Sequence, residues 1–167
     1  AERLAGLLLR VIGVRRDPER SVPGVQRVVG PDALDAVLPE ADLVVLTVPL
    51  TPETRHLIGA AELALMKPSA LILNVGRGGT IDQQALVAAL QAGQIAGAGL
   101  DVTDPEPLPA DSPLWDMDNV LITGHYSGST PAYDERALEI FEENLGHYAR
   151  GEPLRNRLDL RLGIRIS

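Results

Sequence analysis

The chain has 167 residues, of which 45 % are apolar and only 3 % aromatic, and it carries a formal net charge of −8 with no cysteine. This length suits one domain, the acidic balance argues against nucleic acid as the principal partner, and the lack of cysteine excludes disulfides and thiolate metal sites, so we expect no metal. Residues 1–13 lack a secretory signal and no apolar run reaches the length of a membrane span, so we expect a cytoplasmic protein without membrane contact.

Short apolar runs alternate with helix-like stretches along the chain. The runs predict strands at 9–14, 41–48, 70–75, 95–102 and 119–123. The stretches predict helices that begin near residues 31 and 60, and a third at 82–93 that Asp82 caps and Gly93 ends. Strands and helices in alternation predict parallel strands joined by right-handed crossovers, with helices on both faces. The fold class is therefore α/β, with a Rossmann-like doubly wound parallel sheet.

The start of the chain is unusual for such a fold. It opens inside a helix-like stretch without a preceding strand or a G-x-G-x-x-G motif, although LRVIGV at 9–14 looks like the second strand of a dinucleotide-binding unit. A complete unit needs its first strand and its glycine loop. We therefore expect residues 1–130 to form a partial dinucleotide-binding domain, incomplete at its N-terminus, in a fragment or a natural truncation.

Residues 131–167 predict a helix followed by a tail. Thr130 and Pro131 begin the helix and Gly151 ends it. One stripe of the helix carries Tyr133, Ala137, Ile140, Phe141, Leu145 and Tyr148. The tail alternates apolar with polar or small residues, which is typical of a strand; the apolar positions are Leu158, Leu160, Leu162, Ile164 and Ile166.

Polar and glycine-rich groups follow the predicted strands, where doubly wound sheets bind their ligands. These groups are Arg15 and Arg16, Pro49 to Thr51, Gly76-Arg77-Gly78, Asp101 and His125. An arginine such as Arg77 can hold a carboxylate with two hydrogen bonds. A histidine such as His125 can exchange a proton with a carbonyl or alcohol oxygen, and a carboxylate such as Glu106 can orient its ring. Together they suit a 2-oxo acid that receives a hydride from a nicotinamide.

Each of these residues also has a structural interpretation. The glycines around Arg77 supply backbone angles that other residues avoid, which leaves the arginine merely solvated. Prolines on both sides of Glu106 stiffen its loop. A single loop histidine is more often without a catalytic role.

The stretch from Asn74 to Thr130, NVGRGGTIDQQALVAALQAGQIAGAGLDVTDPEPLPADSPLWDMDNVLITGHYSGST, resembles the signature region of the D-isomer-specific 2-hydroxyacid dehydrogenases. The resemblance covers nearly the whole chain. It implies that Arg77 binds the substrate carboxylate and carbonyl, that His125 is the acid/base, and that Glu106 tunes the histidine. For the cofactor it implies contacts at the adenosine from the loop with Val48, Pro49 and Thr51, at the nicotinamide ribose from Val75 and Gly76, and at the carboxamide from Asp101. The glycines would then let the backbone approach the cofactor.

The sequence departs from the family pattern in two places. Gly124 stands where a proline usually precedes the catalytic histidine, which would loosen His125, and Ser127 stands where alanine is usual. Arg15 and Arg16 stand where members that prefer NAD have an acidic residue for the ribose hydroxyls. A guanidinium there favours the 2′-phosphate of NADP, with NAD as the alternative if an arginine only stacks on adenine.

The resemblance predicts an oxidoreductase that transfers a hydride between NADP(H) and a small 2-oxo acid or D-2-hydroxy acid. The helix and tail at 131–167 would return to the missing substrate domain, and the enzyme would be a homodimer. As a fragment, the chain alone would lack activity. The alternatives are a dinucleotide-sensing corepressor of the same fold and an inert truncated product. A formate dehydrogenase is disfavoured, because that relative has glutamine in place of Glu106.

Overall fold

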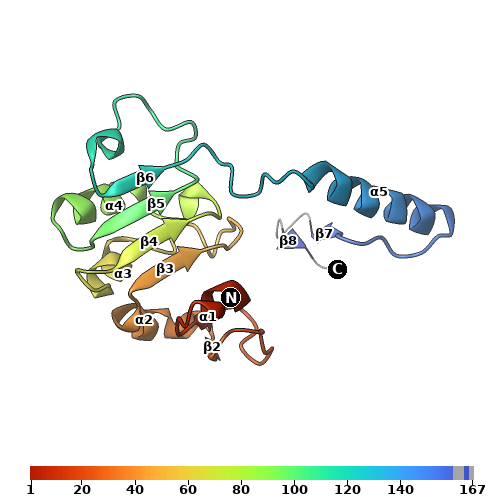
Figure 1. Cartoon of the computed structure of the whole chain (residues 1–167), viewed down its shortest axis with the longest axis horizontal. Helices are drawn as coiled ribbons and strands as arrows, with labels where there is room; N and C mark the ends of the chain where they lie inside the picture. Colours follow the sequence, from red (N-terminus) through yellow and green to blue (C-terminus); the bar gives the residue numbers. More distant parts are fainter. Residues whose placement is uncertain (160–163, 166–167) are drawn as a thin grey trace.

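The computed structural model describes residues 1–159 and 164–165. Its body is a parallel sheet whose strands follow the chain order, β3 (Leu43–Leu46), β4 (Leu71–Asn74), β5 (Gly97–Leu100) and β6 (Val120–Ile122). Figure 1 shows the four strands side by side, with their carboxyl ends at one edge. This confirms the α/β class and the parallel sheet, although each strand is shorter than its apolar run predicts.

A second, smaller sheet stands before β3. It pairs β1 (Ile12–Val14) in parallel with β2 (Arg27–Val29), and it is not hydrogen-bonded to the four-stranded sheet. The sequence analysis missed β2, because a strand of three residues is too short to show a period. Beside the gap, Leu43 and Val45 of β3 are each more than a third exposed. The edge of β3 that faces away from β4 therefore has no strand partner within the described residues.

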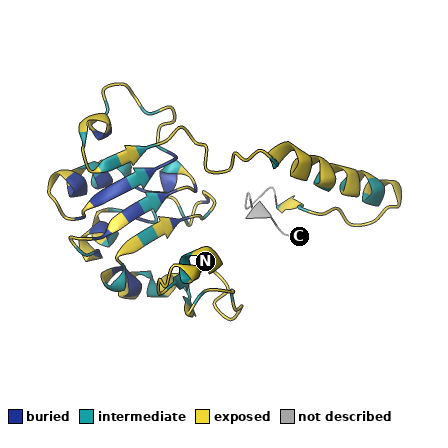
Figure 2. Ribbon diagram, viewed as in Figure 1, coloured by how far each residue is buried: buried dark blue, intermediate teal, exposed yellow. Residues whose placement is uncertain are grey.

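The helices before and between the strands are short. They are α1 (Glu2–Gly6), α2 (Leu34–Val37), α3 (Ala60–Leu65) and α4 (Gln83–Gln91), with 3-10 turns at Pro31–Ala33, Leu38–Glu40, Gly78–Thr80 and Pro113–Asp116. The core lies between the sheet and α3 and α4, and it contains Ile72, Leu63 and Leu86, each almost completely buried. On the opposite face of the sheet Leu71 and Leu121 are exposed. Within the described residues the expected helical cover is thus present on one face only (Figure 2).

Local sequence signals account for the ends of α4. The Asp82 carboxylate accepts hydrogen bonds from the backbone N–H groups of Gln84 (3.0 Å) and Ala85 (3.1 Å), which confirms the predicted cap. Gly93 follows the helix with a φ of +64°, a conformation that glycine adopts without strain. The predicted inner face of the helix, with Leu86 and Leu90, is buried.

The C-terminal part stands apart from the body. An extended segment leads from β6 to the long helix α5 (Tyr133–Ala149), which no other helix or strand of the body covers (Figure 1). None of its residues is buried, and Gly151 follows it with a φ of +67°. The prediction of one tail strand is wrong: β7 (Leu158–Asp159) pairs in antiparallel fashion with β8 (Ile164–Arg165) as a hairpin. Leu160, Leu162 and Ile166 lie outside the described residues.

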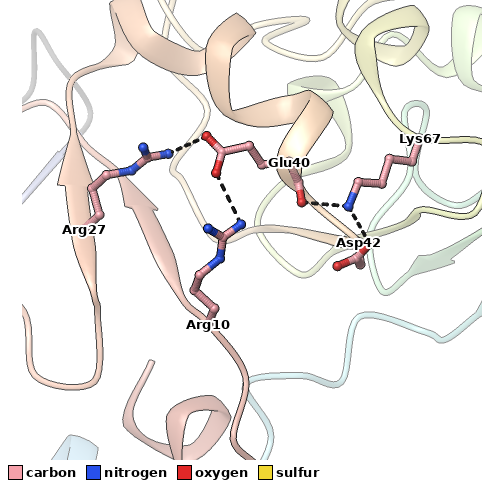
Figure 3. Close-up of polar contacts among 5 residues, drawn as sticks. All are labelled: Arg10, Arg27, Glu40, Asp42 and Lys67. Atoms are coloured by element: carbon pink, nitrogen blue, oxygen red, sulfur yellow. Dashed lines mark hydrogen bonds and ion pairs between the residues drawn. The ribbon is translucent and has the colours of Figure 1, made fainter.

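Charged side chains tie the small sheet to the body (Figure 3). Glu40, just before β3, accepts hydrogen bonds from Arg10 (3.2 Å), which precedes β1, and from Arg27 (2.8 Å) of β2. Lys67, before β4, donates to the Asp42 carboxylate (2.7 Å) and to the backbone carbonyl of Glu40 (2.9 Å). The hydrogen bond from Arg27, more than any other effect, holds the pKa of Glu40 below its usual range. All these residues lie at the amino ends of strands. The cluster therefore does not occupy the carboxyl ends of the strands, where such sheets bind ligands.

Removing the cap of α4 tests the energetic importance of that helix. Asp82→Ala leaves two backbone N–H groups without their acceptor, so we expect it to lower the free energy of unfolding by about 1 kcal/mol. The measurement is urea denaturation followed by circular dichroism. Gln91→Ala, an exposed substitution in the last turn of the same helix, is the control and should change the free energy by less than about 0.5 kcal/mol. Equal effects of the two substitutions would contradict the role of the cap.

Candidate active site

Asn74 organises the loop that follows β4. Its side chain is buried; its amide donates to the carbonyl of Arg77 (3.0 Å) and to the hydroxyl of Thr80 (3.2 Å), and its Oδ1 accepts from the N–H of Gly76 (3.1 Å). The loop therefore wraps around one polar side chain. The sequence analysis did not single out Asn74, although an asparagine at the end of a buried apolar strand was the available signal.

The glycines of this loop allow neighbouring loops to touch it. A Cβ on Gly76 would lie 2.7 Å from the Val48 carbonyl oxygen, in the loop after β3. A Cβ on Gly78 would overlap the Thr103 carbonyl, in the loop after β5. Real side chains do not approach backbone oxygens so closely, so glycine is required for the packing of these three loops. Gly76 also lines the cavity described below. That its backbone approaches a cofactor there remains a prediction.

A cavity of about 370 Å³ opens at the carboxyl edge between the loops that follow β3 and β4. It is lined by Thr47, Val48, Pro49, Leu50, Val75, Gly76 and Arg77. The structure thus brings four of the predicted cofactor residues together with the predicted substrate-binding arginine. Arg77 is exposed, and its guanidinium donates to the carbonyl of Gly76 (2.7 Å). A lining of apolar side chains and backbone groups next to an arginine suits a nucleotide.

His125 and Glu106 meet across two loops. The Nδ1 atom of His125, after β6, lies 2.7 Å from Oε1 of Glu106, after β5. Both side chains are close to 40 % exposed, so a small molecule can reach them. The loop of Glu106 is fixed in turn, because the N–H of Asp104 donates to the side chain of Gln83 in α4 (3.1 Å). With Arg77 after β4, three neighbouring strands carry the predicted catalytic residues to one edge.

Asp101, at the end of β5, binds the loop of His125. Its Oδ1 accepts from the Thr123 hydroxyl (2.5 Å) and the Tyr126 N–H (2.8 Å), and its Oδ2 accepts from the Ser127 N–H (2.8 Å). Burial alone raises the pKa of Asp101, but the hydrogen bonds from these three residues outweigh it and hold the pKa far below its usual range. Asp101 is thus a buried carboxylate at neutral pH. Its predicted contact with the nicotinamide carboxamide remains a prediction.

Gly124 is in contact with the ring of Tyr126. A Cβ at this position would lie 2.8 Å from the ring, so the aromatic side chain fills the space that the usual proline would need. Gly124 does not have a positive φ, whereas His125 does, at +62°. The glycine therefore makes room for Tyr126, and a loosening effect on the histidine stays a prediction.

The remaining predicted cofactor residues lie outside the cavity lining. Thr51 is buried, and its hydroxyl lies 3.2 Å from that of Thr54. Arg15 is half-buried at the end of β1, where its N–H donates to the carbonyl of Val29 (3.0 Å), and Arg16 is exposed. Hydrogen bonds from Thr51 and from its own backbone lower the pKa of Glu53, and the charge of Arg16 lowers it further. Arg16 therefore lies close enough to the loop after β3 to interact with it.

The described part of the chain contains neither a cluster of metal ligands nor a membrane-spanning helix. Among residues 1–159 and 164–165, no group of three or more His, Asp or Glu side chains is arranged to hold a metal ion. Within the same residues, no helix has both the length and the apolar character needed to cross a membrane.

Residues 1–127 match the family model of the NAD binding domain of the D-isomer specific 2-hydroxyacid dehydrogenases. The chain belongs to this family. It is 41 % identical over 155 residues to a glyoxylate reductase of Korarchaeum cryptofilum, with 91 % of this chain and 46 % of that protein covered. The chain spans about half the length of the curated relatives it matches.

Solved structures of family members have the same fold. One is a D-isomer specific 2-hydroxyacid dehydrogenase of Xanthobacter autotrophicus in complex with NADPH and MES, with a TM-score of 0.84, 41 % identity and coverage of 90 % of this chain and 61 % of that chain. Another is an NADPH-dependent glyoxylate/hydroxypyruvate reductase of Sinorhizobium meliloti in complex with NADP and sulfate, with a TM-score of 0.88, 35 % identity and coverage of 98 % and 52 %.

The contact between Gly78 and Thr103 can be tested directly. Gly78→Ala forces the loops after β4 and β5 apart, so we expect it to lower the free energy of unfolding by roughly 1–3 kcal/mol. Gly128→Ala is the matched control, because a Cβ there meets no atom within 4 Å. The measurement is thermal unfolding of the two variants and the unchanged chain. A Gly78→Ala variant as stable as the control would contradict the close packing of the loops.

Proposed function

We propose that this chain is the nucleotide-binding part of an enzyme that reduces a small 2-oxo acid to the D-2-hydroxy acid with NADPH. The observation that carries the proposal is the 2.7 Å contact of His125 with Glu106, at the same edge of the sheet as Arg77. His125 supplies a proton donor, Glu106 a carboxylate that orients its ring, and Arg77 a positive charge that binds the substrate carboxylate. The term "full-length enzyme" denotes a protein of the relatives' length that contains these 167 residues.

The proposed chemistry assigns one task to each of three side chains. The Arg77 guanidinium binds the carboxylate of the oxo acid with two hydrogen bonds and so orients the neighbouring carbonyl. His125 directs Nδ1 at Glu106, so its Nε2 is the atom that delivers a proton to the carbonyl oxygen. Glu106 holds the ring in this orientation through its contact with Nδ1. In the oxidation direction Nε2 takes the proton back from the hydroxyl group.

The cavity between the loops after β3 and β4 suits the cofactor. Val48, Pro49, Val75 and Gly76 line it, and they would hold the nucleotide against the sheet edge beside Arg77. When bound, the nicotinamide supplies the hydride. We propose NADP over NAD, because Arg15 and Arg16 follow β1 and a guanidinium can pair with the 2′-phosphate. The Xanthobacter and Sinorhizobium relatives, which were solved with NADPH and NADP, support this choice.

The names of the relatives guide the choice of substrate. The Korarchaeum relative is a glyoxylate reductase, and the Sinorhizobium relative is a glyoxylate/hydroxypyruvate reductase. We propose glyoxylate and hydroxypyruvate as the first substrates to test. Both carry a carboxylate next to a carbonyl, which is the arrangement that Arg77 and His125 would require.

We further propose that residues 131–167 pack against another domain of the full-length enzyme. The support is the exposed apolar stripe of α5, where Leu138, Phe141 and Leu145 are each more than half exposed. Burial of such side chains would stabilise α5, none of whose residues is buried in this structure. A homodimer remains a proposal that rests on the family alone.

His125 is expected to act on the substrate and not on the dinucleotide. In the full-length enzyme, His125→Ala should lower kcat for glyoxylate reduction by roughly 100-fold to 10,000-fold, because the general acid is lost. The dissociation constant of NADPH, measured by fluorescence titration, should stay within twofold. Glu106→Gln should lower kcat less, because the neutral amide holds the His125 ring more weakly than the carboxylate does. A His125→Ala variant that loses NADPH binding would contradict the assignment.

Arg15 is expected to select the cofactor. A charge-assisted hydrogen bond to the 2′-phosphate is worth roughly 1.5–3 kcal/mol, so the full-length enzyme should prefer NADPH to NADH by roughly tenfold to a hundredfold in kcat/KM. Arg15→Asp should reverse or abolish this preference, because a carboxylate repels the phosphate and accepts from the ribose hydroxyls. Arg20→Asp, an exposed charge reversal away from the strand end, is the control. A preference that Arg15→Asp leaves unchanged would show that this arginine does not contact the cofactor.

A further inference from the structure

We propose that Asp101 is a positioning residue that holds His125 in the geometry needed for proton transfer. The inference rests on the proposed function and adds a residue to it. Its basis is the set of hydrogen bonds by which the Asp101 carboxylate binds the loop of His125 on both sides of the histidine.

The backbone of His125 needs such a constraint. Its φ of +62° lies in the left-handed region, which residues other than glycine rarely adopt. Thr123, two residues before the histidine, gives its hydroxyl hydrogen to Asp101, and Tyr126 and Ser127, directly after it, give their backbone N–H groups. Hydrogen bonds to an ionised carboxylate are short and strong. The histidine is thus the apex of a turn whose two ends are bound to one buried anion.

Asp101 is itself fixed to the rest of the site. Its backbone N–H donates to the carbonyl of Asn74 at the end of β4 (3.0 Å), and the N–H of Thr123 donates to the carbonyl of Leu100 (2.9 Å). The side chain of Asn74 holds the loop of Arg77. Asp101 therefore anchors the loop of His125, and Asn74 anchors the loop of Arg77, at the same edge of the sheet. We infer that these two buried polar residues fix the distance between His125, the proposed proton donor, and Arg77, which binds the substrate carboxylate.

The alternative is that Asp101 serves the cofactor. A contact with the nicotinamide carboxamide would use acceptor capacity that remains on Oδ2, which accepts from the Ser127 N–H. The two roles predict different results for Asp101→Asn. Loss of a cofactor contact weakens NADPH binding, whereas loss of positioning lowers kcat and frees the loop.

The first experiment uses the 167-residue chain and measures backbone amide exchange by NMR. In Asp101→Asn at least one of the Tyr126 and Ser127 amide protons should exchange at least tenfold faster, because the NH2 group that replaces one carboxylate oxygen cannot accept from the N–H group that faces it. Asp82→Asn is the matched control: its carboxylate also accepts two backbone N–H groups, but these belong to Gln84 and Ala85 in α4 and not to the loop of His125. It should leave Tyr126 and Ser127 unchanged. Unchanged exchange in Asp101→Asn would overturn the proposal.

The second experiment measures the kinetics of the full-length enzyme. Asp101→Asn should lower kcat for glyoxylate by tenfold to a hundredfold, with the NADPH dissociation constant within twofold, and Asp82→Asn should change neither. A tenfold weaker NADPH affinity with an unchanged kcat would assign Asp101 to the cofactor and overturn the proposal. Thr123→Val, which removes only the hydroxyl donor, should lower kcat by a smaller factor and leave the NADPH dissociation constant unchanged. If Asp101→Asn does not fold, this variant distinguishes the positioning role from the cofactor role by the same two measurements.

The proposed function and this inference fail in different ways. Absence of turnover in the unchanged full-length enzyme would refute the proposed function and, with it, the positioning role. Turnover that Asp101→Asn leaves intact would refute only the positioning role.

Discussion

Close packing between the loops after β3, β4 and β5 is the constraint on which the site depends. Gly76 and Gly78 bring the loop of Arg77 against the carbonyl oxygens of Val48 and Thr103, at distances that no side chain would permit. The loop cannot move outward without losing the hydrogen bonds that the buried Asn74 makes with it. The cavity at the sheet edge is lined by residues of the loops after β3 and β4, which this packing brings together.

Two buried polar residues extend this constraint to the histidine. Asn74 holds the loop of Arg77, Asp101 holds the loop of His125, and a backbone hydrogen bond joins the two residues across β4 and β5. A buried polar group must be satisfied, and here the hydrogen bonds that satisfy Asn74 and Asp101 also fix the loops of Arg77 and His125. The same buried hydrogen bonds therefore stabilise the sheet edge and fix the loops that carry the proposed site residues.

Local patterns predict much of this fold, and long-range contacts explain the rest. The strands around Ile72 and Leu100, the Asp82 cap and the end of α4 at Gly93 follow from burial, capping and backbone preference, which act within a few residues. The order of elements also places Arg77, Glu106 and His125 at one edge, because parallel strands end together. Resemblance to the family, not periodicity, indicates what those residues do.

Other features could not be predicted, because they depend on residues far apart in the sequence. The carboxylate of Asp101 meets its partners 22 to 26 residues away, so no local pattern marks its part in holding His125. The role of Gly78 depends on Thr103, in another loop. The three-residue strand β2 is too short to show a period, and the tail hairpin depends on a reversal that the alternation of apolar residues does not mark.

The most direct test of the account is the fate of the hydride in the full-length enzyme. Hydroxypyruvate is reduced with NADPH that carries deuterium at both C4 positions of the nicotinamide, and the product is examined by NMR and chiral chromatography. The account predicts deuterium at C2 of the D isomer, and loss of this product in the Arg77→Gln and His125→Ala variants. A product without deuterium, the L isomer, or full activity of both variants would contradict it.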